Sequence, residues 1–262
     1  MSNQMDHLTM NPNTPEFLSE TKLKLDEWVS VINTPSFIER DPVQFPRRYS
    51  NLLDIEVVAF LTATITWGNR KMILNSATKM LAIMGESPYD YIISEGYKSL
   101  GTRNIHRTFF EPDFAYICRG LNYYYKFESS LESIFFKASD MWNGIENFRN
   151  YMSEGNSGLF SKHISNPSTA SACKRLHLAL RWLVRNDGIV DLGIWKNISP
   201  SSLYIPLDVH VGRISREMNF LERNQNDRLS VEKLTETLRI FSPEDPVKYD
   251  FALFGIGEQR AH

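Results

Sequence analysis

The side chains best suited to covalent chemistry are a lysine and an aspartate in the second half of the chain. Lys174 lies in the segment SACKRLHLALRWLVRNDG, and Asp208 lies 34 positions later in LYIPLDVHVGR. A lysine amine can attack an electrophilic carbon and form a Schiff base, while a nearby carboxylate can take up protons and stabilise positive charge. Lys196 is a second candidate nucleophile, but the sequence around it predicts a loop.

Asp208 stands where a helix is predicted to begin. Pro206 restricts the backbone just before it, and the residues that follow are typical of a helix. Backbone N–H groups and the positive end of the helix dipole favour the ionised carboxylate at such a position. An ordinary helix N-cap without a catalytic role fits the same placement, so the position alone leaves both interpretations open.

The elements that must position these residues are predicted to be helices. From Pro15 onward apolar residues repeat at three and four positions, and the segment 51–69 is apolar on nearly every side, as in a central buried helix. No alternation of strands and helices indicates a parallel sheet. The sequence predicts an all-α protein with helices within the segments 15–33, 51–69, 70–86, 87–95, 111–152, 171–188, 207–220, 230–242 and 243–258.

Two polar segments divide this helical pattern. Residues 1–15, MSNQMDHLTMNPNTP, predict a flexible N-terminus, followed by a helical domain over residues 16–262. The loop SEGNSGLFSKHISNPSTAS contains several glycines and serines and separates two halves. We therefore expect subdomains over about 40–155 and about 160–262, the latter with the N-terminal helix.

The composition predicts a packed globule, with 42% hydrophobic and 12% aromatic residues. The net charge of -2 and the pI near 6.3 argue against binding nucleic acid through overall charge, although a local basic face remains compatible with them. Small basic clusters provide such faces, or are ordinary solvated helix surfaces: Arg47 and Arg48, Arg70 and Lys71, Lys174 and Arg175, Arg181 and Arg185, and Arg213 and Arg216.

The sequence gives no pattern for a metal or a cofactor. Cys118 and Cys173 cannot form a four-thiolate cluster, and we interpret both as buried apolar residues. The six histidines show no paired spacing typical of a metal site. No apolar run reaches the roughly 18 to 20 residues of a membrane span, and the N-terminus does not look like a signal peptide, so we expect a cytoplasmic protein.

The segment after Leu203 resembles the P-V-D-x-H-V-x-R element of the helix-hairpin-helix glycosylase superfamily, which contains endonuclease III and the 8-oxoguanine glycosylases. The matching residues are Pro206, Asp208, His210, Val211 and Arg213. The resemblance implies a DNA glycosylase-like helical fold with a cleft between two packed subdomains. It also implies a catalytic role for Asp208 and a monomer that acts on a damaged base in double-stranded DNA. For His210 a structural hydrogen bond near the helix start is the alternative.

The lysine fits one branch of that superfamily. The separation between Lys174 and Asp208 resembles the archaeal 8-oxoguanine glycosylases, in which a lysine ahead of the aspartate is the nucleophile, and this favours Lys174 over Lys196. Arg175 and Arg213 are then expected at the base pocket or the DNA surface. The short L-P-G-x-G turn of the family, which grips DNA phosphate, is not recognisable here. The segment NPSTASA before Lys174 is the candidate replacement, as a phosphate-binding helix N-terminus.

Two further segments resemble the same superfamily. FLTATITWGNRKM is similar to its buried helix and the following loop that wedges into DNA, which would hold Trp67, Asn69 and Arg70. A core aromatic is the alternative for Trp67, and a solvated turn is the alternative for the other two. KYDFALFGIG resembles the helix that lines the base pocket, with Asp250 and Phe254 at the matching spacing. Phe254 stands where a tryptophan is expected.

The chain from about residue 40 resembles an uncharacterised bacterial family more closely, the domain of unknown function DUF2400. We therefore keep three functional hypotheses. The first is a base-excision glycosylase, with abasic lyase activity through a Lys174 Schiff base and no cofactor. The second is a catalytically inactive, repair-associated protein that binds DNA, favoured by the acidic balance and the missing hairpin. The third is a helical interaction module without a nucleic-acid role, for which the dispersed charge is the support.

Overall fold

A computed structural model describes residues 14–259, and within them the chain is mostly helical, so the all-α prediction is confirmed. Residues 1–13, most of the segment predicted to be flexible, lie outside the described part. The helices are α1 (Pro15–Ile32), α2 (Pro35–Arg40), α3 (Leu52–Thr64), α4 (Arg70–Met84), α5 (Pro88–Ile93), α6 (Glu111–Tyr124), α7 (Glu132–Phe136), α8 (Met141–Glu154), α9 (Lys174–Val184), α10 (Val209–Glu217), α11 (Arg228–Phe241) and α12 (Tyr249–Gln259).

Short elements join these helices. Turns of 3-10 helix lie at Pro42–Gln44, Pro46–Arg48, Gly96–Ser99, Pro200–Ser202 and Pro246–Lys248. One antiparallel hairpin, β1 (Asn104–His106) paired with β2 (Phe109–Phe110), was not predicted from the sequence. None of the described helices combines the length and hydrophobicity that crossing a membrane requires.

Helix α3 is the central buried helix that the sequence predicts. The Asn51 side chain caps it by accepting the N–H of Leu53 at 2.8 Å, which satisfies one of the free donors of the first turn. Every residue from Asp54 to Thr64 is buried, and α3 packs against α9. The absence of a polar face follows from this position, because neighbouring elements cover the helix on all sides.

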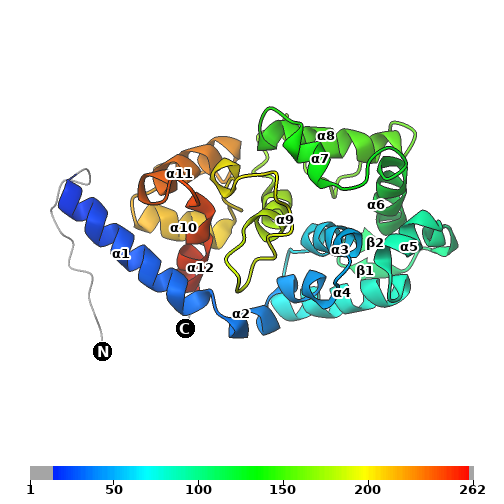
Figure 1. Cartoon of the computed structure of the whole chain (residues 1–262), viewed down its shortest axis with the longest axis horizontal. Coiled ribbons are helices and arrows are strands. Elements are labelled where there is room, and N and C mark those ends of the chain that lie inside the picture. Colours follow the sequence, from blue (N-terminus) through cyan, green and yellow to red (C-terminus); the bar gives the residue numbers. More distant parts are fainter. Residues whose placement is uncertain (1–13, 260–262) are drawn as a thin grey trace.

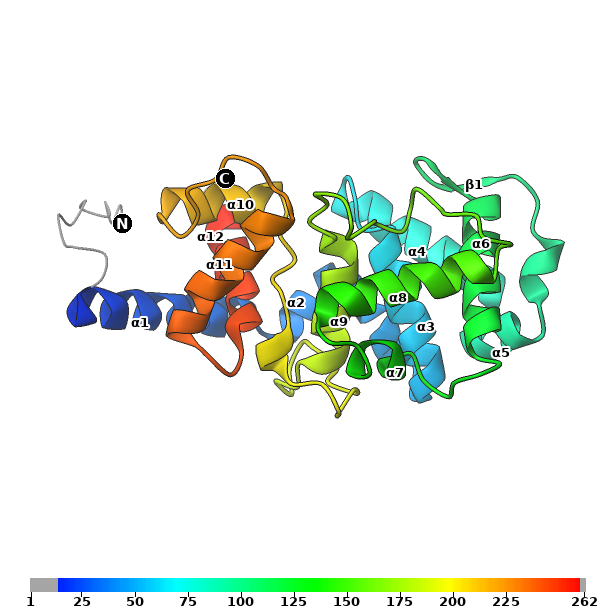
Figure 2. The same cartoon turned by 90° about the horizontal axis from the view of Figure 1, so that it is seen from above.

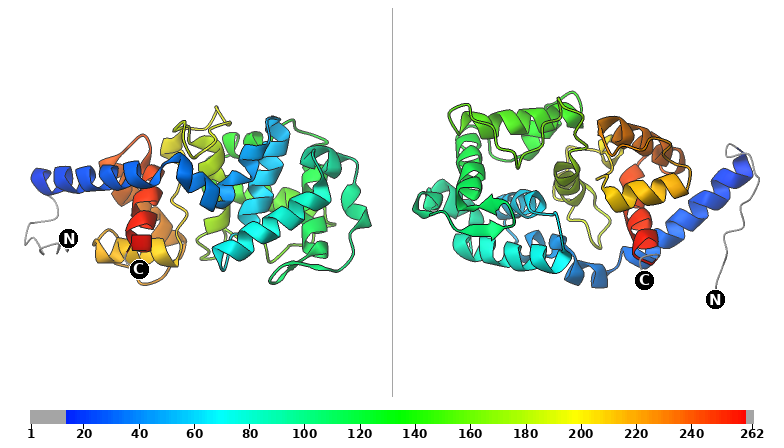
Figure 3. Two further views of the ribbon diagram at one scale, coloured as in Figure 1. Left: turned by 90° about the horizontal axis from the view of Figure 1, so that it is seen from below. Right: turned by 180° about the vertical axis from the view of Figure 1, so that it is seen from behind.

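The helices gather in two groups with α9 between them. Helices α3 to α8 lie at one end of the molecule, and α10 to α12 lie at the other (Figures 1 and 2). The C-terminal end of α1 packs along α12, and its N-terminal end projects away from the body of the molecule (Figure 3). Helix α9 packs on α3 of the first group, and α10 packs on α12 of the second group. The starts of α9 and α10 therefore lie where the two groups of helices adjoin.

A buried carboxylate links α3 to two loops near α9. Glu56 of α3 is fully buried and accepts hydrogen bonds from Leu131 N–H at 2.9 Å, Trp195 Nε1 at 2.6 Å and Tyr125 at 3.3 Å, and also from the hydroxyl of Ser130. Burial raises the pKa of Glu56, and these donors lower it by less. The loop that holds Trp195 leads from α9 toward α10, so Glu56 fixes the connection between the two helices that form the site.

Candidate active site

Lys174 and Asp208 meet in the structure, each at the start of a helix. Helix α9 begins at Lys174, directly after Cys173, whose φ of 45° lies in the left-handed region. Asp208 is the N-cap of α10, and its Oδ1 accepts the N–H of Val211 at 2.8 Å. The Nζ of Lys174 lies 3.1 Å from Oδ2 of Asp208. The candidate nucleophile therefore contacts the carboxylate with which the sequence paired it.

The helix cap at Asp208 and its contact with Lys174 involve different carboxylate oxygens. One oxygen caps α10 and the other faces the lysine, so the aspartate is both an N-cap and an ion-pair partner. Burial raises the pKa of Asp208, but the ammonium group of Lys174 and the N–H of Val211 lower it by more, and the net pKa lies below the ordinary value. Asp208 is consequently ionised at neutral pH.

The ion pair faces a pocket of about 930 Å³. Such a volume lies in the range of about 300 to 1,000 Å³ that is usual for small-molecule sites. Both halves of the chain line the pocket, and eight of the ten site residues proposed from the sequence are among the lining residues: Trp67, Arg70, Lys174, Arg175, Asp208, His210, Asp250 and Phe254.

One wall of the pocket is formed by Trp67 and the side chains that hold it. Trp67 is stacked near His163 with ring centres 5.7 Å apart, and His106 meets it edge-on at 4.8 Å. The guanidinium of Arg175 lies 5.0 Å from the Trp67 ring centre and donates to the carbonyl of Thr64 at 2.7 Å. Arg175 therefore fixes the end of α3 and the indole, rather than pointing freely to solvent.

Aromatic rings of α2 and α12 form another part of the wall. Phe254 meets Phe37 edge-on with ring centres 5.7 Å apart, and the guanidinium of Arg70 lies 5.0 Å from the Phe254 ring centre. Arg70 is also paired with Glu258 at 3.0 Å. Aromatic faces combined with a few polar groups suit a flat, partly polar ligand such as a nucleobase.

Asp250 of α12 and Arg181 of α9 also line the pocket. They form an ion pair, and both side chains are buried. Burial raises the pKa of Asp250 to about 6, and Asp208 adds to this increase, while Arg181 and Lys174 oppose it. The pKa values of Asp208 and Asp250 thus move in opposite directions.

Two residues of the site were not found from the sequence. Asp41, between α2 and the first 3-10 turn, lines the pocket and accepts the N–H of Val43 at 3.0 Å, and burial raises its pKa. Arg181 was noted only as part of a basic cluster. An Asp-Pro pair is a common start of a helical turn, and an arginine on a helix is usually exposed, so neither carried a local signal for the site.

Several residues proposed for DNA contact lie elsewhere. Asn69 is the N-cap of α4 and Arg213 is an exposed partner of Glu217 at 2.7 Å, and neither is among the pocket residues. His210 is exposed at the pocket, and no hydrogen bond of its side chain is found within residues 14–259, where the alternative interpretation placed a structural bond near the helix start. The segment NPSTASA is a turn-containing loop, and α9 begins only after it, without a side-chain cap.

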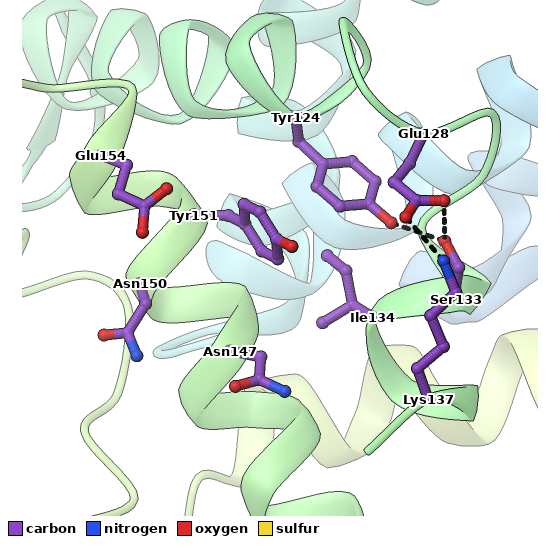
Figure 4. A pocket seen from close by; sticks show the side chains of 9 residues that line it. All are labelled: Tyr124, Glu128, Ser133, Ile134, Lys137, Asn147, Asn150, Tyr151 and Glu154. Carbon is purple, nitrogen blue, oxygen red and sulfur yellow. Dashed lines mark hydrogen bonds and ion pairs between the residues drawn. The ribbon is translucent and has the colours of Figure 1, made fainter.

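A second pocket, of about 340 Å³, lies between α6, α7 and α8 (Figure 4). One of its carboxylates, Glu128, accepts from Lys137 at 2.6 Å and from Ser133 at 3.1 Å, and the hydroxyl groups of Tyr124 and Ser133 are hydrogen-bonded to each other. These groups satisfy one another, and no nucleophile paired with a free base lies among the residues drawn. The first pocket is therefore the better candidate for chemistry.

Metal and thiol chemistry find no support in the described part of the chain. Cys118 and Cys173 are both buried and unpaired, as expected, and burial raises the pKa of Cys173 to about 11. Residues 14–259 contain no cluster of three or more histidine, cysteine, aspartate or glutamate side chains arranged to hold a metal ion.

Comparison with known proteins identifies a family but no activity. The family model of DUF2400, described as a protein of unknown function, matches residues 41–259, which is most of the chain and includes every residue of the Lys174 pocket except Phe37. No curated protein and no solved structure matches the sequence.

Proposed function

Because the chain belongs to the DUF2400 family, a family of unknown function, we propose its activity from its own site. The proposed reaction is excision of a damaged base, such as 8-oxoguanine, from double-stranded DNA, followed by an abasic lyase step at Lys174. The observation that carries the proposal is the 3.1 Å contact between the Lys174 amine and the Asp208 carboxylate in a pocket of about 930 Å³ with aromatic walls.

The pocket dimensions suit a nucleotide that has left the helix. A glycosylase must extrude its target, at a cost of a few kcal/mol, before the scissile bond becomes reachable. Stacking between the extruded base and aromatic side chains offsets this cost, and Trp67 and Phe254 supply such surfaces. The similarity of the Pro206 to Arg213 segment to the helix-hairpin-helix glycosylase element supports the same assignment.

The chemistry begins with proton transfer. Lys174 gives a proton to Asp208, and the free amine attacks C1′ of the sugar while the bond from C1′ to the base breaks and the base takes the electron pair. The nitrogen then loses a proton to solvent and gives its electron pair to C1′, the bond from C1′ to O4′ breaks, and O4′ takes up the proton that Asp208 accepted, which leaves the Schiff base. The Asp208 carboxylate removes a proton from C2′, the bond from C3′ to the phosphate oxygen breaks, and loss of the 3′ phosphate cleaves the strand. While it is ionised, Asp208 also stabilises the positive charge at the sugar.

Borohydride trapping tests the proposal directly. Hydride reduces the Schiff base to a stable amine, so the protein should gain the mass of the oligonucleotide when it is mixed with an abasic duplex or an 8-oxoguanine duplex. Lys174→Gln should abolish the adduct. Lys196→Gln is the matched control and should retain it, because the Lys196 amine bonds to the carbonyl of Gly193 and does not line the pocket.

The possible results separate the three hypotheses. Salt-dependent duplex binding without an adduct would favour the noncatalytic, repair-associated DNA-binding protein. Absence of binding at low salt would favour an interaction module without a nucleic-acid role. An adduct that persists in Lys174→Gln would refute the assignment of the nucleophile.

A further inference from the structure

We propose that Asp250 is a second catalytic residue of this site, the general acid that protonates the base as it departs. The inference rests on the proposed glycosylase function and adds a role that the Lys174–Asp208 pair leaves open. That pair acts at the sugar, where the amine attacks and the carboxylate takes its proton. The departing base still carries an unshared electron pair and leaves more easily as a neutral molecule than as an anion.

The position of Asp250 suits this role. It lies in the first turn of α12, is 7% exposed, and lines the same pocket as the ion pair. Oδ2 accepts a hydrogen bond from Nη1 of Arg181. Oδ1 accepts no hydrogen bond from any residue between 14 and 259, so this oxygen can carry a proton and donate it to a ligand.

The charges around Asp250 also favour its protonated form, because the neighbouring carboxylates outnumber the guanidinium groups. Asp250 belongs to a buried network in which two guanidinium groups contact four carboxylates, so the cations cannot neutralise every acid. The contacts are Arg181 with Asp191 and Asp250, and Arg185 with Asp187, Asp191 and Asp245.

The other acids of this network are better compensated than Asp250. Asp191 contacts both guanidinium groups, and Asp245 accepts three hydrogen bonds from Arg185. Asp187 accepts the N–H groups of Ile189 and Val190 in addition. Asp250 has a single donor within residues 14–259, so a proton is added there at the lowest cost.

The charged groups that face Asp250 come from several elements. Arg181 and Lys174 of α9 favour its ionised form, Asp208 at the start of α10 favours its protonated form, and burial favours the protonated form most of all, which brings the pKa to about 6. Arg70, Asp41 and Glu258 line the same pocket. A carboxyl group with a pKa near 6 is protonated in a useful fraction at neutral pH and still gives up its proton readily.

Expulsion of the base requires one proton. The Lys174 nitrogen bonds to C1′, the bond from C1′ to the base nitrogen breaks, and the electron pair of that bond goes to the base. Asp250 transfers its proton to a ring nitrogen or carbonyl oxygen of that base, and becomes a carboxylate paired with Arg181. A proton from solvent restores the acid after the base has left.

The test compares two substrates, because only one of them contains a base to expel. Wild-type protein and Asp250→Asn are assayed for excision from duplexes containing 8-oxoguanine, uracil or hypoxanthine, and for borohydride trapping on a preformed abasic duplex. We expect the ratio of the excision rate to the trapping rate to fall by about 10² to 10⁴ in Asp250→Asn, the usual contribution of general acid catalysis. Wild-type excision should also slow as the pH rises above about 6, a dependence that the variant loses.

Two further variants separate catalysis from structure. Asp250→Glu keeps the acid and should recover part of the excision rate. Glu128→Gln removes an ion-paired carboxylate at the second pocket, outside this network, and should leave the ratio unchanged. Equal loss of excision and trapping in Asp250→Asn, or an unchanged excision rate, would overturn the inference while leaving the glycosylase proposal intact.

Results with the wild-type protein separate the two proposals. If it traps on abasic DNA but excises none of the three bases, the role of Asp250 is overturned, because there is no departing base to protonate. If the wild-type protein neither traps on abasic DNA nor excises a base, the proposed glycosylase function is refuted, and the role of Asp250 that rests on it is refuted as well.

Discussion

Replacing Glu56 should weaken the fold strongly, although this residue lies outside the pocket. Glu56→Ala removes the acceptor of Leu131 N–H and Trp195 Nε1, both in buried surroundings. Each unsatisfied buried donor costs about 1 to 3 kcal/mol. The hydroxyl groups of Ser130 and Tyr125 can reorient, so we count only the first two donors and expect a loss of roughly 2 to 6 kcal/mol.

Urea denaturation followed by far-UV circular dichroism measures this loss as a shift of the midpoint at unchanged slope. Glu56→Gln keeps one acceptor oxygen but turns an NH₂ group toward the remaining donors, so it should cost about half as much. Exposed Glu20, whose carboxylate pairs with Lys24 one turn away, provides the control, and Glu20→Ala should change stability by less than about 0.5 kcal/mol. A loss below about 1 kcal/mol in Glu56→Ala would show that the carboxylate does not hold these loops.

Two other predictions concern stability. His177 is buried with neither ring nitrogen hydrogen-bonded in the described structure, and burial lowers its pKa to about 3, so the unfolded state binds the proton first. Stability should therefore fall by up to about 1.4 kcal/mol per pH unit below pH 6.5, and His177→Phe should reduce this slope in urea titrations at pH 7 and pH 5.5. Gly193→Ala should lower the melting temperature more than Gly188→Ala. Both glycines have a positive φ, but only at Gly193 would an added Cβ meet other atoms, since it would lie 2.4 Å from the Cβ of Asn186. Equal slopes, or equal melting temperatures, would contradict the respective prediction.

The helices were predictable because their signals are local. The uniform apolar character of 51–69 gave a buried helix, and Gly85 ended the next helix where expected. The start of α9 was not predictable, since Cys173 adopts a left-handed conformation that cysteine rarely adopts and no side chain caps the helix. The hairpin at residues 104–110 was missed because two very short strands have no periodicity to detect.

The residues of the site were also predictable only where the signal was local. Asp208 could be found because it follows a proline at a helix start, and the resemblance to the glycosylase superfamily favoured Lys174 as its partner. Asp41 and Arg181 become pocket residues only through packing between segments far apart in the chain, and no pattern near either of them records those neighbours. Conversely, Asn69 had a motif position but its side chain serves as a helix cap. Sequence therefore located helix ends better than it located the direction in which side chains point.

The opposite pKa shifts of the two aspartates follow from their different donors and suggest how one pocket can handle two protons. Asp208 has an N–H at a helix start and a lysine ammonium within hydrogen-bond distance, so its charged form is favoured and it can receive a proton from the amine. Asp250 is more deeply buried, and the one guanidinium that it contacts in the described part of the chain also contacts Asp191, so its neutral form persists to higher pH. Pairs of acids separated in this way commonly divide the work of acid and base. Burial sets the separation, because it is the largest cause of the raised pKa of Asp250, while Arg181 opposes that increase and Lys174 is the largest cause that lowers the pKa of Asp208.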